Sequence, residues 1–373
     1  MFFSCDTILQ DILGVDEKFE LPPVPQDTTS YSERFIQINP AWDGEFFGFS
    51  LDSVQDIHIG MDQLIYIADT GNDRILMLDK AGNLQGERHF DNPLALSQDS
   101  RLNLLVANGT NTIFRIRLAE VNHVFADAPI DTIDENWFYG WGESFIEDYF
   151  APAKFVGVAA FGDEHFYATD AFGNLVWRFC NECKTINDSI VYPTFGAILY
   201  EGSGLGTTQN PMAMTSFFVP GDDPSETIQN SGCLFTQNGD EILLQGIQPV
   251  ENGAGYQSVL PADMSMDYVS LFSESEIDNQ LKDVTVDRYG NIYVADATGN
   301  KIWVFDKDGN QKESETSSDS HIQYLSFGDE NLFDSPAGIT YNSGLGENIL
   351  YVADTGNNRI LRFKLTSDFD NWD

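Results

Sequence analysis

The segment "NIYVADATGNKIWVFDKDGN", residues 291–310, has close copies at two other places in the chain. "LIYIADTGNDRILMLDKAGN" occupies residues 64–83, and "ILYVADTGNNRILRFKL" occupies residues 349–365. The copies share A-D-x-(T)-G-N-x-(R/K)-I, with alternating β-type residues on both sides of a Gly-Asn pair. Alternation indicates strands, and Gly and Asn tolerate positive φ, so each copy predicts a β-hairpin.

Weaker copies fill the rest of the chain, at residues 166–179, 103–118 and 233–247. Each copy follows a short leader that also resembles a strand, and the six leaders occupy residues 54–60, 93–97, 155–160, 211–215, 281–287 and 336–340. A further strand-like run separates the units. Six repeats of four short antiparallel strands predict an all-β fold, a six-bladed β-propeller.

The repeat "GNIYVADTGNxRI" also resembles the NHL repeat family, which builds six-bladed propellers. The similarity spans roughly residues 34–365 and is clearest in the first, fifth and sixth units. The resemblance implies a ring in which the faces of each blade are buried by its neighbours.

A ring must be closed, and the last unit ends with its third strand at residues 359–365. We expect residues 34–38 to supply its outer strand, which pairs the two ends of the chain and covers an exposed sheet edge. The chain therefore divides into an N-terminal arm, residues 1–33, and a propeller, residues 34–373. The arm contains the Pro-rich stretch "FELPPVPQDTTSYSE", which favours extended structure.

The composition is strongly acidic, with 59 Asp and Glu residues against 19 Lys and Arg residues and a formal net charge of −40. This balance argues against nucleic acid and against an anionic membrane surface as partners. It is compatible with a solvated surface, a cationic partner or bound Ca²⁺. No signal peptide and no apolar stretch of membrane-spanning length is visible, which predicts a cytoplasmic location or incorporation into an assembled particle.

The innermost strand of each blade lines the central channel of a propeller. Alignment of the leaders places Asp56, His58 and Asp283 on the face predicted to line the channel, among small residues such as Gly157 and Gly338. Two carboxylates and an imidazole suit Ca²⁺ or another divalent ion, and they equally suit hydrated polar groups.

Related propellers include amidating lyases and lactonase-like enzymes, which hold a metal at the channel mouth. The lyase pattern requires several channel histidines, whereas His58 is the one histidine of five that falls on the predicted face. The lactonase pattern requires acidic and Asn ligands on separate blades, and Asp56 and Asp283 supply part of it. No catalytic residue is predicted.

An insertion at residues 135–150 concentrates aromatic side chains, including Trp137, Phe138, Tyr139 and Trp141. Such a cluster packs on the propeller rim, anchors a protein interface or stacks on sugars, because Trp and Tyr concentrate binding energy. Interleaved carboxylates favour partners that carry Arg or Lys.

The sequence therefore predicts a noncatalytic binding or assembly module that contacts protein partners through residues 1–33 and 135–150. A narrower expectation is a structural component of a large particle, such as a viral appendage. The alternative is a metal-dependent propeller enzyme, lyase- or lactonase-like, with its site in the central channel.

Overall fold

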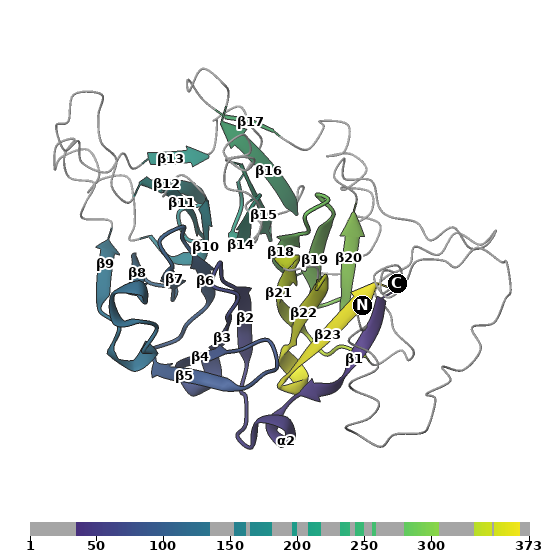
Figure 1. Ribbon diagram of the computed structural model, residues 1–373. Coiled ribbons are helices and arrows are strands. Elements are labelled where there is room, and N and C mark those ends of the chain that lie inside the picture. Colours follow the sequence, from purple (N-terminus) through teal and green to yellow (C-terminus); the bar gives the residue numbers. More distant parts are fainter. Residues whose placement is uncertain are drawn as a thin grey trace, which may run out of the picture.

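The computed structural model describes residues 35–134, 153–161, 165–180, 196–199, 208–217, 232–238, 243–249, 256–258, 280–305, 332–344 and 347–365. Their strands form six antiparallel sheets around a central axis, so the predicted six-bladed β-propeller is confirmed (Figure 1). The innermost strands contact one another in a closed ring, in the order β2, β6, β10, β14, β18, β21 and back to β2.

Blades one to five follow the chain, each starting at the axis and ending at the rim. Their strands are β2 (Val54–Ile59), β3 (Ile65–Asp69), β4 (Arg74–Leu78), β5 (Leu84–His89), β6 (Ala95–Gln98), β7 (Asn103–Ala107), β8 (Thr112–Arg117), β9 (Ile130–Asp134), β10 (Phe155–Phe161), β11 (His165–Asp170), β12 (Leu175–Cys180), β13 (Gly196–Leu199), β14 (Pro211–Ser216), β15 (Cys233–Gln237), β16 (Leu244–Pro249), β17 (Tyr256–Ser258), β18 (Leu281–Val286), β19 (Ile292–Asp296) and β20 (Lys301–Phe305). All six predicted leaders are innermost strands.

Blade six joins the two ends of the chain. It contains β21 (Pro336–Asn342), β22 (Ile349–Asp354) and β23 (Arg359–Leu365), and its outermost strand is β1 (Phe35–Trp42). Phe35 pairs with Leu365 in antiparallel register, as the closure hypothesis requires, and the strand runs four residues beyond the predicted Ile38. Trp42 is fully buried at its end, and the short helix α2 (Gly44–Phe47) follows. The predicted arm, residues 1–33, lies outside the described residues.

The hydrophobic core is divided among the six interfaces between neighbouring blades. Each interface holds one cluster of buried side chains contributed by both blades. Between blades six and one, for example, Tyr351 and Ile360 pack with Ile57, Ile67 and Leu76. Both faces of a blade are thus apolar, which explains why the strand sequence is repeated: a single blade has no means of burying its own faces.

The loop that follows the second strand, A-D-T-G-N in the first and sixth units, joins four of the blades to the next. Four residues after the Asp stands an Asn or Asp with left-handed backbone, and its side-chain oxygen accepts the backbone N–H of a residue just before the next innermost strand. Asn358 accepts from Ser53 at 2.9 Å, and Asn300 accepts from Ser335 at 2.7 Å. Asp73 and Asn174 act in the same way toward Asn92 and Asn210.

We call these four pairs the inter-blade clamps. All eight residues have φ between 45° and 55°, the region in which Asn and Asp are the least strained residues after glycine. The positive φ therefore falls on the residue after Gly-Asn in the first and sixth units and on the Asn itself in the third and fifth, and not on the Gly. That is a correction to the simple Gly-Asn hairpin.

The Asp of the loop is a structural residue. Asp69 and Asp354 are fully buried, and each accepts the backbone N–H of the residue two positions before its own leader. Each also accepts the Nε–H of an arginine five residues later, at 2.6 Å for Arg74 and 2.7 Å for Arg359. These contacts explain the Asp-to-Arg spacing of the repeat. In the described part of the chain, no helix has the length and apolarity that a membrane span requires.

Candidate functional site in the central channel

The predicted channel face of the innermost strands lines the central cavity, and its acidic side chains also bond to the neighbouring blade. Asp56 Oδ2 accepts the backbone N–H of Leu96 in blade two at 2.6 Å, and Asp283 Oδ2 accepts that of Ile339 in blade six at 2.8 Å. In blade six, the residue equivalent to Asp56 and Asp283 is Gly338. A Cβ atom added to Gly338 would lie 2.5 Å from Asp56 Cα. Glycine therefore allows direct backbone approach, and Asp fills the wider gap with a hydrogen bond.

Asp56 and Asp283 come together although blade six lies between their blades. The two carboxyl groups lie close enough for each to influence the pKa of the other, and both side chains are buried, at 9% and 7% exposure. Gly338 has no side chain to separate them. Each carboxyl also accepts a backbone N–H at its second oxygen, from Ile57 and Val284.

This environment favours one proton shared by the pair. Burial raises the pKa of Asp56 from 3.8 to about 7, against the lowering effect of its hydrogen bonds. Burial and then the charge of Asp56 raise the pKa of Asp283 well above its ordinary value. Two coupled carboxyls titrate as a unit, and a protonated carboxyl keeps its acceptor oxygens while donating to its partner.

His58 lies two residues along β2 and makes the equivalent contact one step further down the channel. Its Nε2 accepts the backbone N–H of Gln98 at 3.0 Å. Burial lowers the pKa of His58 from 6.5 to about 4, against the opposing charge of Asp62. The imidazole is therefore neutral near pH 7, and one of its nitrogens is committed to joining blades one and two.

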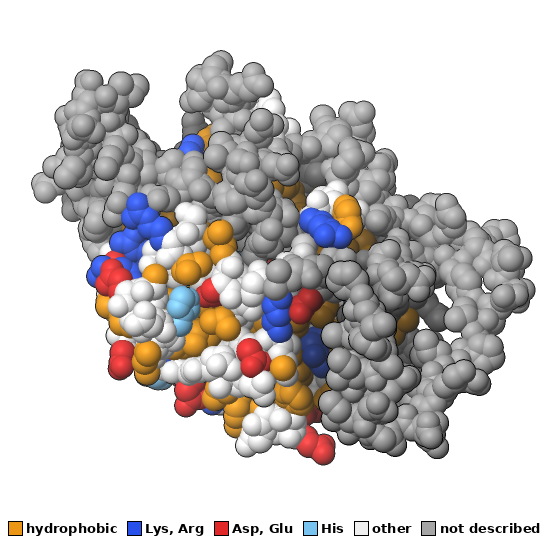
Figure 2. All heavy atoms as spheres, in the orientation of Figure 1, with side chains coloured by type: hydrophobic (Ala, Val, Ile, Leu, Met, Phe, Trp, Pro, Cys, Tyr) orange, Lys and Arg blue, Asp and Glu red, His pale blue; other side chains and the backbone are white. Residues whose placement is uncertain are grey.

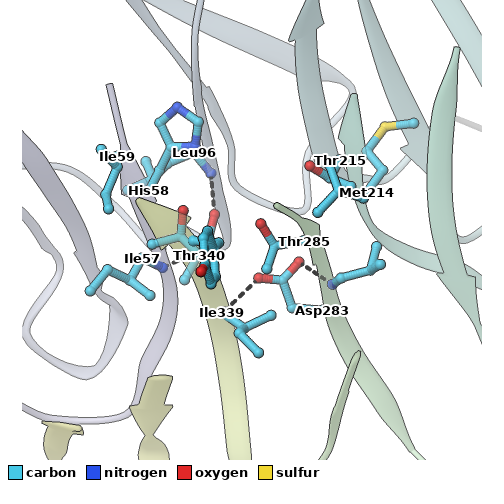
Figure 3. A pocket seen from close by; sticks show the side chains of 14 residues that line it. Ile57, His58, Ile59, Leu96, Met214, Thr215, Asp283, Thr285, Ile339 and Thr340 are labelled. Atoms are coloured by element: carbon cyan, nitrogen blue, oxygen red, sulfur yellow. Dashed lines mark hydrogen bonds between the residues drawn. The ribbon is translucent and has the colours of Figure 1, made fainter. Parts of the chain in front are cut away.

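The channel itself is narrow. Beside the carboxyl pair lies a cavity of about 50 Å³, whose lining includes His58, Thr215, Thr285 and Thr340 (Figure 3). A second cavity of about 40 Å³ continues toward Gln98 and Ser216. Figure 3 shows Asp283 held by hydrogen bonds on both sides, toward the Ile339 backbone and toward the neighbouring residue of its own strand.

The three predicted metal ligands therefore have different neighbours. Asp56 and Asp283 meet, whereas His58 bonds to blade two. Within the ranges that the structure describes, no group of three or more His, Cys, Asp or Glu side chains is arranged to hold a metal ion. The lone pairs that a cation needs accept N–H groups instead, so the geometry fits a proton better than a divalent ion. Divalent-ion binding here stays a prediction.

The predicted binding surface, Trp137, Phe138, Tyr139 and Trp141, lies outside the described residues. Sequence reasoning missed a larger cavity of about 380 Å³, formed where β2, β18 and β21 begin. Its lining includes Gln55 and Lys282, the residues directly before Asp56 and Asp283. Their position at the start of innermost strands was the available signal.

Comparison with known proteins supports the fold and does not establish a function. No family model and no curated protein matches the chain, so the NHL similarity stays a resemblance. Matching structures include a protein of unknown function from Bacteroides thetaiotaomicron VPI-5482, with TM-score 0.54, 16% identity and coverage of 90% of this chain and 76% of that one.

Two further matches carry functional names. A streptogramin B lyase has TM-score 0.51 at 13% identity, covering 90% of this chain and 98% of that one. A protein provisionally described as a gluconolactonase has TM-score 0.52 at 11% identity, covering 90% and 92%. At such identities the likeness establishes a shared β-propeller fold, and neither activity transfers with it.

Proposed function

We propose that this propeller is a noncatalytic module that binds a partner protein. The observation that carries the proposal is the use of the channel residues: Asp56, His58 and Asp283 each hold the next blade through a backbone N–H. These were the sequence's candidates for metal chemistry, and here they stabilise the ring. The channel cavity of about 50 Å³ is also small beside typical ligand sites of roughly 300–1,000 Å³.

The partner is expected to carry a basic surface. The net charge of −40 favours association with Lys- and Arg-rich proteins and repels acidic ones. On the face in Figure 2, acidic side chains are scattered over the described residues and form no single patch. The net charge therefore attracts basic proteins in general, and a more specific contact must select the partner.

The aromatic insertion supplies such an anchor. It lies in the sequence between β9 and β10, and the residue directly before β10 contacts an exposed aromatic residue of the described structure. Phe172, in the β11–β12 turn, is 55% exposed, and the Lys154 ammonium lies 5.4 Å from its ring centroid. We therefore add Phe172, a residue of the described structure, to the proposed contacts Trp137, Phe138, Tyr139 and Trp141. The arm, residues 1–33, is the second proposed contact.

The test is reconstitution with an identified partner. Affinity capture with the full chain supplies candidates, and a purified candidate is then titrated calorimetrically against the wild type, Trp137→Ala/Trp141→Ala and Phe172→Ala. We expect stoichiometric binding that weakens at least tenfold in the double variant and weakens with added salt.

The enzyme alternative makes the opposite prediction. If the chain hydrolyses lactones or cleaves a streptogramin-like substrate, folded Asp56→Asn and His58→Gln variants should lose that activity while the aromatic variants keep it. An activity with this dependence contradicts the proposal, as does the failure of every purified candidate to bind.

The narrower role, a component of a large particle such as a viral appendage, is a further proposal that rests on the acidic sequence and the N-terminal arm. Co-sedimentation of the native protein with a particle, lost when residues 1–33 are deleted, would support it.

A further inference from the structure

The cavity of about 380 Å³ is formed by blades five, six and one. Innermost strands β18, β21 and β2 begin there, and the turns after β19 and β22 complete its wall. The residues that line it include Gln55, Gln280, Lys282, Thr298 and Ala337. Its volume lies within the range of small-molecule sites, unlike the channel below.

Lys282 is the charged residue of this lining, and its lack of a partner is unusual in so acidic a protein. Ion pairs engage many cations of the described structure, among them Arg74, Lys80, Arg115, Arg117 and Arg359. Lys301 lies over the ring of Trp303 instead. Among the described residues, Lys282 makes no ion pair, side-chain hydrogen bond or ring contact, although the chain has 59 acidic residues and only 19 Lys and Arg residues.

The other polar side chains of the cavity are neutral. The amides of Gln55 and Gln280 each offer donors and an acceptor, and the Thr298 hydroxyl offers one of each. Thr298 and Gln280 are exposed and Lys282 is half-buried, so their polar groups are accessible to a ligand. The small side chain of Ala337, which is buried, leaves the space above it open.

We propose that this cavity binds a small hydroxylated carboxylic acid, with its carboxylate on Lys282 and its hydroxyls on Gln55, Gln280 and Thr298. One ammonium group neutralises one negative charge, so a monoanion fits. A dianion such as phosphate would bring uncompensated charge into the field of a protein with net charge −40. The proposal does not rest on the protein-binding role, because it concerns the isolated chain, and its residues belong to blades five, six and one, whereas Phe172 belongs to blade three.

The test compares two probes that differ in charge. D-glucuronate and D-glucose have the same ring, and only glucuronate carries a carboxylate. Calorimetric titration at constant sodium concentration should show that wild type binds glucuronate and binds glucose roughly ten- to a hundredfold more weakly, the usual effect of losing a charge-assisted hydrogen bond. Lys282→Gln should lose affinity for glucuronate by a similar factor, and Lys282→Arg should retain most of it. Lys154→Gln, on blade three, should bind as wild type does.

A second measurement needs no variant. Partial acetylation of the full chain, followed by mass spectrometry, reports the reactivity of Lys282 against Lys154 as internal reference. Glucuronate should protect Lys282 selectively, and glucose should not. The proposal is overturned if wild type binds no glucuronate at tens of millimolar, if both probes bind or protect equally, or if Lys282→Gln binds like wild type.

Discussion

Replacing both carboxyls of the channel pair, in Asp56→Asn/Asp283→Asn, should change how folding stability depends on pH. The sign follows from the raised pKa of each group. Folded Asp56 holds its proton to about pH 7, whereas the ordinary value is 3.8. The folded state therefore binds more protons than the unfolded state between these values. The resulting stabilisation is complete below pH 3.8 and is lost as the pH rises through about 7.

The magnitude follows from the size of the shift. A rise of roughly three pKa units corresponds to about 4 kcal/mol for Asp56, of which about 3 kcal/mol is lost between pH 5 and pH 9. Asp283 adds loss of the same sign, because its pKa is raised further by the charge of Asp56. The free energy of unfolding, measured by urea titration, should favour wild type at pH 5. That advantage should shrink by about 3 kcal/mol or more at pH 9.

The comparison removes the effect of His58, which both proteins retain. Its lowered pKa has the opposite consequence: the unfolded state binds the extra proton between about pH 4 and 6.5, so stability rises with pH there. The exposed variant Glu87→Gln/Asp91→Asn removes two carboxyls elsewhere and controls for net charge. Asn at position 56 should itself reduce stability, because its N–H₂ group would face the backbone N–H donor of either Ile57 or Leu96. If the stability difference stays constant within about 0.5 kcal/mol from pH 5 to 9, the pair does not share a proton.

Three further predictions address the ring and its ions. Asn358→Ala removes the acceptor for the Ser53 N–H and places alanine at φ 51°, so it should cost about 1–2 kcal/mol in urea unfolding, with Asn358→Gly intermediate; wild-type stability of the alanine variant would contradict the clamp. Deleting residues 1–42 removes β1 and uncovers the edge of β23, so light scattering should detect dimers or aggregates, and a monodisperse product with unchanged Tm would refute this closure. A divalent ion at Asp56, His58 and Asp283 requires that Ca²⁺ raise the Tm of wild type at pH 8 and that EDTA reverse the change, whereas equal responses in Asp56→Asn/Asp283→Asn rule the site out.

Strand alternation carried most of the fold. Period-two patterns placed all six innermost strands, and the missing fourth strand of the last unit located the closing strand near Phe35. Alternation says which residues share a face of one strand, and it does not say what that face meets. Asp56 and Asp283 do line the channel cavity, as predicted, but alternation gave no sign that their carboxyl groups also accept backbone N–H groups of the next blade.

The sequence contains a signal for the inter-blade clamps that our sequence analysis did not use. Before four innermost strands stand Asp52-Ser53, Asp91-Asn92, Gln209-Asn210 and Asp334-Ser335, each an acidic or amide residue followed by Ser or Asn. Their partners Asp73, Asn174, Asn300 and Asn358 stand four residues after the loop Asp. The two motifs can be paired only if one knows that a loop of one blade faces the leader of the next. The periodicity of a single strand does not contain this tertiary information.

The clamps and the carboxyl pair together constrain where function resides in this propeller. Residues that belong to the repeat, such as Asp69, Asn358 and Tyr351, make structural contacts within and between blades. Their recurrence in several blades is explained by those contacts alone, so recurrence carries no functional information here. Lys282 and Phe172 differ: neither residue type recurs at the equivalent position of the first or sixth unit, where Gln55, Ala337 and the Thr-Gly loops stand. Selection for ring stability does not account for an unpaired cation or an exposed aromatic ring, and such residues are the ones that binding experiments should target first.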